Sequence, residues 1–123
     1  MIFSESLKKY KDFQRVYKNG KSYANKYLIM YILKNDMQKN RIGISVSKKV
    51  GNSVVRHRIT RLIRESYRLN EKDFVGGLDM VIIARPGAKE KDFFTIESAL
   101  LHLGRLHCIM KKEENEENTY LSD

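Results

Sequence analysis

The sequence lacks the features that mark secreted and membrane-spanning proteins. Its one cysteine, Cys108, excludes a disulfide within the chain and fits a reducing cytoplasm. No apolar run approaches the roughly 20 residues of a membrane span, and the first five residues have no signal-peptide layout. At 123 residues the chain has room for one modest core, so we expect a single cytoplasmic domain in which Cys108 is a small buried residue.

Side chains that could hold a metal ion are also few. Residues 1–112 contain ten acidic residues, and these are scattered along the chain without a repeated ligand spacing. The three histidines, His57, His102 and His107, form no obvious metal or general-base set. Because a protein metallonuclease needs clustered carboxylates around its ions, we predict that this protein has no catalytic residue and no metal site of its own.

The net charge of the chain is strongly positive, and it is unevenly distributed along the sequence. Residues 1–112 carry 24 basic against 10 acidic residues, a net charge of +14. A field of this size attracts nucleic acid or an anionic membrane, and such binding weakens steeply as salt rises. The segment 113–123 has five acidic residues, no Lys or Arg and few apolar residues. We therefore predict a folded domain over 1–112 and a disordered acidic tail over 113–123.

Changes in hydrophobic periodicity predict the order of helices and strands. The strand at 27–33 has apolar residues on both faces, which indicates that it is covered on both sides. The order α-β-β-β-α-β-α predicts a single-domain α+β fold, a two-layer sandwich of one central sheet with helices packed on it. The predicted helices cover 7–19, 52–69 and 92–110, and the predicted strands cover 22–24 (short), 27–33, 41–47 and 78–84.

The predicted helix at 52–69 is the most informative segment, because it separates into an apolar face and an arginine-rich face. Each guanidinium can fork onto phosphate oxygens without losing its charge, so a rigid row of arginines suits a polyanion. One acid accompanies five arginines, which argues against an ordinary salt-bridged surface. The apolar face comprises Val55, Ile59, Leu62, Ile63 and Leu69, and the opposite face comprises Arg56, His57, Arg61, Arg64 and Arg68.

Four ordered blocks, at 12–20, 44–49, 48–65 and 82–85, resemble the protein subunit of bacterial ribonuclease P. The resemblance covers about residues 7–110. Its most specific part is similar to the family's RNR motif, although His57 replaces the motif's asparagine and Thr60 replaces a usual lysine. These two departures leave the contact made at 57 open, because the charge of a histidine varies near neutral pH.

The resemblance implies an RNA-binding protein that assists a catalytic RNA. In this family the RNA subunit removes the 5′ leader from precursor tRNA with Mg²⁺ held mainly by RNA, and the protein binds no membrane and no small-molecule substrate. It also implies a left-handed crossover from strand 41–47 through the arginine helix to strand 78–84, against the general preference. The residues implied for the catalytic RNA are Lys48, Lys49, Arg56, His57, Arg58, Arg61, Arg64 and Arg68, and those implied for a leader-binding cleft are Phe13, Tyr17 and Tyr31.

Other interpretations remain open from the sequence. Periodicity alone favours ordinary core packing for Phe13, Tyr17 and Tyr31, and the resemblance reverses that preference; Tyr10 and Tyr27 stay undecided. An architectural RNA-binding protein of ribosomal type would keep the basic helix but need no cleft, and full burial of Phe13 and Tyr31 would favour it. A helix-turn-helix DNA reader needs a helix before the arginine helix, where this sequence predicts a strand.

Overall fold

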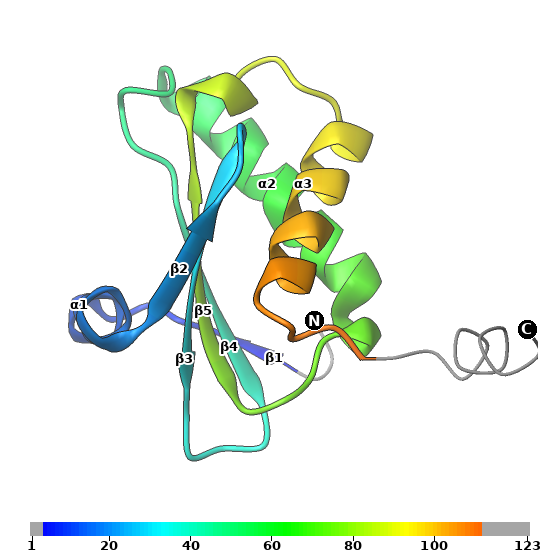
Figure 1. The fold of residues 1–123 in the computed structure, drawn as a ribbon. Helices are drawn as coiled ribbons and strands as arrows, with labels where there is room; N and C mark the ends of the chain where they lie inside the picture. Colours follow the sequence, from blue (N-terminus) through cyan, green and yellow to red (C-terminus); the bar gives the residue numbers. More distant parts are fainter. Residues whose placement is uncertain (1–3, 112–123) are drawn as a thin grey trace, which may run out of the picture.

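Five strands form one mixed sheet in the order β1-β4-β5-β3-β2 (Figure 1). The computed structural model describes residues 4–111, so the acidic segment 113–123 lies outside the described residues. The predicted α+β class, with a single central sheet and helices packed on it, is confirmed. The strands are β1 (Ser4–Ser6), β2 (Lys21–Ala24), β3 (Leu28–Lys34), β4 (Asn40–Ser45) and β5 (Leu78–Ala84); the helices are α1 (Tyr10–Asn19), α2 (Ser53–Asn70) and α3 (Phe93–Leu106), with short 3₁₀ turns at Glu71–Asp73 and Pro86–Ala88.

The edge strand β1 is an addition to the predicted order. It runs parallel to β4, with Ser4 opposite Asn40. Three residues are too few to show an alternating pattern, so periodicity could not predict this strand. It is held by a tertiary contact, because the Ser4 hydroxyl lies 2.7 Å from the hydroxyl of Tyr67 in α2.

The strands β4 and β5 are parallel neighbours, and α2 lies in the connection between them. Adjacent parallel strands need such a crossover, since a hairpin can join only antiparallel strands. This is the strand-helix-strand unit that the resemblance implies, and its left-handedness stays a prediction. Because the element before α2 is the strand β4, the helix-turn-helix arrangement does not occur there.

Helices cover the two faces of the sheet unequally (Figure 1). On one face α2 and α3 enclose the larger core, in which Met30 and Ile82 of the sheet pack with Ile63. On the other face α1 covers a smaller cluster around Val16 and Val81. This arrangement confirms that β3 is covered on both sides, and it leaves part of the α1 face of the sheet open.

Two helix ends and one helix face differ from the prediction: α1 begins at Tyr10 and not at 7, α3 ends before 110, and Leu69 lies off the apolar face of α2. The helix α3 ends at Leu106, because Cys108 takes a positive φ of 59° and turns the chain so that the Val75 amide donates to the Ile109 carbonyl. Cys108 is therefore exposed, and Leu106 is 40% exposed. In α2, Leu69 lies about 120° around the helix from Ile63. It is 54% exposed, so it does not belong to the apolar face.

Candidate RNA interface

The exposed face of α2 carries a row of basic side chains. The helix begins where the Asn52 side chain accepts a hydrogen bond from the Val55 amide at 3.0 Å. The fully buried Ile59, Ile63 and Tyr67 fix one side of the helix against the core. The opposite side therefore faces solvent, and it presents His57, Arg61, Arg64 and Arg68.

The arginines of α2 differ in whether their guanidinium groups bond to other groups of the protein. No ion pair links Arg61 or Arg64 to an acid within residues 4–111. Arg68 donates two hydrogen bonds to Glu65, and these bonds lower the pKa of that exposed carboxyl. Arg58 donates to the Lys91 carbonyl at 2.8 Å and so ties α2 to the loop before α3. Arg61 and Arg64 are thus the arginines best placed to bind an external anion.

Arg56 does not lie on the exposed row, contrary to the sequence prediction. It is about 20° around the helix from Ile63, on the side that faces the core. Its side chain is partly buried, and its Nε is buried with no hydrogen-bond partner among the described residues. A helical wheel drawn with Ile63 and Tyr67 at its centre would have shown this, because Arg56, Ile63 and Tyr67 share one side.

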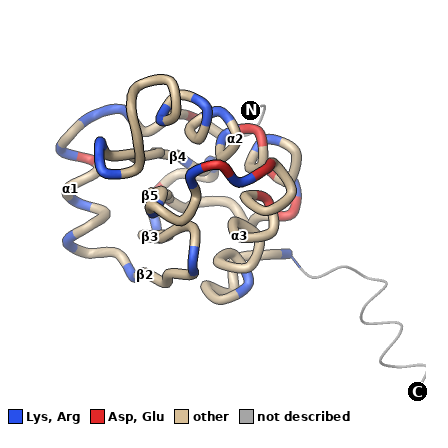
Figure 2. The backbone as a smooth tube through the Cα atoms, turned by 90° about the horizontal axis from the view of Figure 1, so that it is seen from above, with Lys and Arg blue, Asp and Glu red and all other residues tan. Residues whose placement is uncertain are grey.

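Lys48 and Lys49 extend the basic surface beyond the helix. Both are exposed in the turn between β4 and α2, where the Val50 amide donates to the Ser47 carbonyl at 3.1 Å. Figure 2 shows further Lys and Arg positions along α1 and β2. Positive charge thus surrounds much of the molecule, and α2 with the turn before it carries seven Lys and Arg residues and one acid.

The predicted aromatic residues come together on the opposite face of the sheet. Phe13 and Tyr17 project from α1, and their ring centroids are 6.3 Å apart. The ring of Tyr31 from β3 meets Tyr17 edge to face at 5.1 Å. All three side chains are partly exposed, beside the open part of the sheet. We call these three residues the aromatic cleft.

Two residues of β4 hold the α1 rings in place. Gly43 leaves room for Phe13, because a Cβ at this glycine would lie only 2.6 Å from the ring carbon Cζ. Ser45 lies beside the Tyr17 hydroxyl, and partial burial raises the pKa of that tyrosine. The rings are therefore fixed in position while part of each remains open to solvent, which is the geometry needed to stack an incoming base.

Comparison with known proteins identifies the family. Residues 2–107 match the sequence profile of the family described as Ribonuclease P. The chain belongs to this family. It is 63% identical over 115 residues to the ribonuclease P protein component of Lachnoclostridium phytofermentans, covering 94% of this chain and 99% of that protein. It is 50% identical to the protein component of Clostridioides difficile, covering 81% and 89%.

Solved structures of ribonuclease P proteins have the same fold. The protein of Staphylococcus aureus superposes with a TM-score of 0.81 at 37% identity, covering 88% of this chain and 99% of that chain. That of Thermotoga maritima gives 0.76 at 35% identity, covering 82% and 96%. As the protein component of ribonuclease P, this chain is a subunit of a tRNA-processing endoribonuclease, and its partner is the ribonuclease P RNA.

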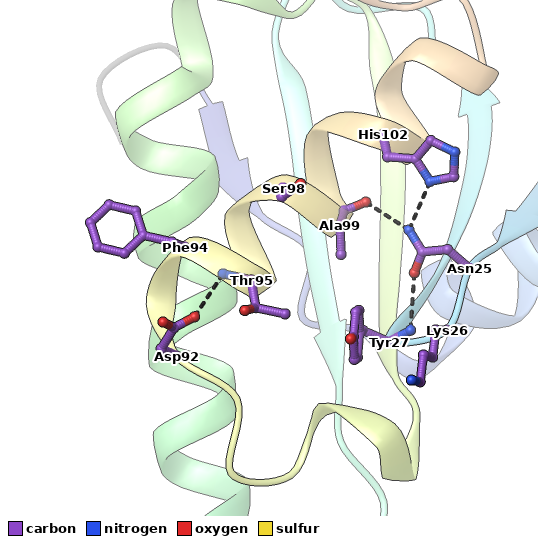
Figure 3. Close-up of a pocket in the computed structure, with 9 residues that line it drawn as sticks. All are labelled: Asn25, Lys26, Tyr27, Asp92, Phe94, Thr95, Ser98, Ala99 and His102. Atoms are coloured by element: carbon purple, nitrogen blue, oxygen red, sulfur yellow. Dashed lines mark hydrogen bonds between the residues drawn. The ribbon is translucent and has the colours of Figure 1, made fainter.

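Outside the two surfaces, a hollow lies between the β2–β3 turn and α3 (Figure 3). Asn25 lines it and joins its two walls by donating to the Ala99 carbonyl at 2.9 Å while accepting from the Leu28 amide. Tyr27, left undecided by the sequence, packs here against the larger core, away from the aromatic cleft. The lysines Lys26 and Lys91 each lie 5.8 Å from the centre of its ring.

The histidines and acids in the described part of the chain form no metal-binding cluster. Within residues 4–111 no three His, Cys, Asp or Glu side chains gather closely enough to hold an ion. His107 donates to the Met30 carbonyl at 2.8 Å, and burial lowers its pKa. His102 accepts from Asn25 on the surface of α3. In the same part of the chain, no helix has the length and apolar character to cross a membrane.

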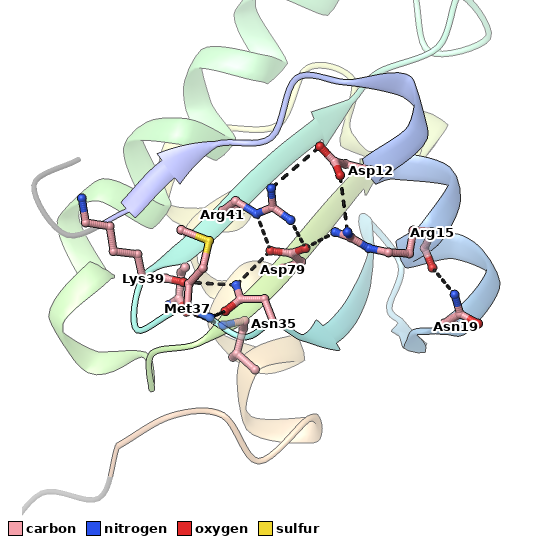
Figure 4. Close-up of polar contacts among 10 residues, drawn as sticks. Asp12, Arg15, Asn19, Asn35, Met37, Lys39, Arg41 and Asp79 are labelled. Atoms are coloured by element: carbon pink, nitrogen blue, oxygen red, sulfur yellow. Dashed lines mark hydrogen bonds and ion pairs between the residues drawn. The ribbon is translucent and has the colours of Figure 1, made fainter.

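A buried ion network, which the sequence pattern did not predict, lies beside α1 (Figure 4). Asp79 of β5 is fully buried in a strand that is otherwise apolar. Its carboxylate accepts from Arg41 at 2.8 and 2.6 Å, from Asn35 at 2.9 Å, and from Arg15 of α1. Asp12 of α1 lies 3.4 Å from Arg15 and 3.8 Å from Arg41. One acid inside an apolar strand was the available signal, since a buried charge needs partners.

This network predicts a loss of stability in acid. Burial alone would raise the pKa of Asp79, but the hydrogen bonds from Arg41 and Asn35 and the charges of Arg41 and Arg15 lower it below the usual carboxyl value. The pKa of Asp79 is thus lower in the folded protein than in the unfolded chain, where it is about 4. Its carboxylate therefore stabilises the folded protein above about pH 4, and this stabilisation is lost as the pH falls through the lowered pKa.

Replacing Asp79 by asparagine tests this directly. The change leaves two arginines without their buried counter-charge, so we expect the free energy of unfolding at neutral pH to drop by about 3–5 kcal/mol. It should also make that free energy less dependent on pH below about pH 4. Urea unfolding of both proteins across this range is the measurement. An equal acid slope in the two proteins would show that Asp79 is not the group responsible.

Proposed function

We propose that this protein assists a catalytic RNA in removing the 5′ leader from precursor tRNA, and that it does so with two separate RNA-binding surfaces. The exposed arginines of α2, with Lys48 and Lys49, bind the RNA subunit. The aromatic cleft on the other face of the sheet binds the single-stranded leader. The observation that carries the proposal is the arrangement of the rings: Phe13, Tyr17 and Tyr31 adjoin one another and stay partly exposed on the face opposite α2.

The first surface suits a folded RNA. Contacts from arginine and lysine to phosphate and sugar recognise the shape of an RNA helix more than its sequence. Because Arg61 and Arg64 have no acidic partner in the described part of the chain, no internal ion pair has to break when they bind phosphate. His57, also exposed, stands in the same row and can donate a hydrogen bond there.

The second surface suits a single strand. Every base has a flat face, so stacking on Phe13, Tyr17 or Tyr31 would accept leaders of different sequence. Full burial of Phe13 and Tyr31 would have favoured an architectural protein without leader binding, but both side chains are partly exposed. The leader interpretation therefore accounts for this exposure, which a purely structural role would leave unexplained.

The protein's part in the reaction is binding, not chemistry. The Mg²⁺ ions would be held mainly by RNA, and they would activate the attacking water and stabilise the leaving oxygen. The basic surface would lower the magnesium concentration that the RNA subunit requires, because lysine and arginine neutralise phosphates that otherwise need counterions. Orienting the leader would place the scissile bond at the RNA's active site.

Reconstitution with a bacterial ribonuclease P RNA tests this division of labour. We expect the purified protein alone to cleave no precursor tRNA at any magnesium concentration. Added to the RNA subunit, it should restore cleavage at magnesium concentrations too low for the RNA alone. Cleavage by the protein without RNA would contradict the proposal, and so would an RNA subunit whose magnesium requirement the protein leaves unchanged.

A further inference from the structure

The helix α1 supplies two of the three rings of the aromatic cleft, and its apolar contacts with the sheet come from Val16, Phe13 and Tyr17. Val16 is its one buried residue, and it packs with Leu7 and Val81 in the smaller cluster. The residue before the helix, Lys9, makes no side-chain capping bond. Phe13 and Tyr17 also pack against this cluster, and Phe13 lies over Gly43, but these contacts hold only the apolar side of the helix. A contact on the opposite side is needed to fix the rotation of the helix about its own axis.

The ion network lies on the side of α1 opposite the rings. Around the helix, Arg15 is about 160° from both Phe13 and Tyr17. Arg15 reaches across to Asp79 of β5, and Asp12 on the same side approaches Arg41 of β4. Figure 4 shows these side chains converging on the Asp79 carboxylate from α1 and from the sheet.

Successive residues on one face of β4 contact first the charged side of α1 and then its aromatic side. Arg41, Gly43 and Ser45 point to the same face of the sheet, because side chains alternate along a strand. Arg41 stands opposite Asp79 and joins the network, Gly43 leaves room for Phe13, and Ser45 lies beside Tyr17. The helix therefore lies across β4 with its charged side fixed at one point of the strand and its rings placed further along.

We infer that Asp79 is a positioning residue for the aromatic cleft, because its bond to Arg15 sets the rotation of α1 and thereby holds Phe13 and Tyr17 beside Tyr31. This inference rests on the proposed leader binding. Asp79 touches no RNA in this account, since it is fully buried. Its effect reaches the leader only through the helix.

The substitution Arg15→Met tests the inference with little risk to the fold. It removes the bond from α1, whereas Asp79 keeps its hydrogen bonds from Arg41 and Asn35. We expect the reconstituted holoenzyme to bind precursor tRNA about tenfold more weakly, with unchanged affinity for mature tRNA. Nuclear magnetic resonance of the free protein should show weaker contacts between the Tyr17 and Tyr31 rings. Arg15→Lys, which keeps a cation near Asp79, should restore most of the affinity.

Lys18→Met is the matched control, because it removes the same charge from an exposed position of the same helix. It should leave the ring contacts unchanged and weaken precursor tRNA binding less than Arg15→Met. Equal effects of the two substitutions would overturn the inference. A loss of affinity in Arg15→Met that comes with a shallower salt dependence would also overturn it, because that would mark a direct phosphate contact.

The failure of this inference can be told apart from the failure of the proposed function. If Tyr31→Ala weakens leader binding but Arg15→Met does not, the inference fails and the proposed function stands. If neither substitution weakens leader binding, the leader proposal itself fails.

Discussion

Replacing Arg61 and Arg64 together by alanine is expected to weaken binding of the RNA subunit about 100-fold or more. Hydrogen bonds to charged groups contribute about 1.5–3 kcal/mol each, and ~1.4 kcal/mol corresponds to a factor of ten in affinity. The two side chains are exposed and have no ion-pair partner within the described residues, so the fold should be unaffected. Arg56 is left intact because its side chain is partly buried, and its removal would mix a binding effect with a packing effect.

The salt dependence separates a direct contact from a general loss of charge. Each phosphate contact contributes about 0.7–0.9 to the slope of log affinity against log salt, so the double variant should show a correspondingly shallower slope. Alanine at both Lys72 and Arg105, exposed basic residues outside α2, is the control, since it removes the same net charge. If both double variants weaken binding equally at physiological salt, the α2 row is only a solvated surface.

Replacing Tyr31 or Phe13 by alanine is expected to weaken binding of precursor tRNA by up to roughly 1–3 kcal/mol for each lost stacked base. Affinity for mature tRNA should barely change, because that RNA has no leader. Both side chains are partly exposed, so the loss of stability should be modest. The measurement is the affinity of the reconstituted holoenzyme for each RNA, together with thermal unfolding of the free protein.

An interpretation of these rings as ordinary core gives the reverse pattern. Truncating a core phenylalanine costs about 3–5 kcal/mol of stability and would have no effect specific to the leader. Phe94→Ala provides the aromatic control, because this ring is 74% exposed on α3, on the other face of the sheet. Equal losses of affinity for both RNAs, with a large drop in melting temperature, would assign Phe13 and Tyr31 to the core.

Much of the fold could be predicted because its signals are local. The strands β3 and β5 are long apolar runs, and α2 and α3 begin at Asn52 and Asp92, whose side chains accept from the amides of the first turn. The strand β1 could not be predicted, because its three residues are held by pairing with β4. The end of α3 was missed for a similar reason: the chain turns at Cys108 to reach a strand-like bridge between Phe74 and Met110.

The candidate site divides in the same way. The basic row of α2 follows from helical periodicity. The prediction was wrong only for Arg56, which lies near the centre of the buried face and not on the exposed row. The aromatic residues could be named only through the resemblance, since periodicity cannot tell a partly open ring from a buried one. The bonds from Arg15 and Arg41 to Asp79 join residues 64 and 38 positions apart, so no local pattern contains them.

The central claim, that the aromatic cleft binds the leader, is tested most directly by varying the leader alone. Affinity would be measured for precursor tRNAs whose leaders increase in length one nucleotide at a time, with the RNA subunit alone and with the reconstituted holoenzyme. Our account predicts that affinity for the holoenzyme rises with leader length until the cleft is filled, while affinity for the RNA subunit alone stays level. The same dependence on leader length with and without the protein would contradict it.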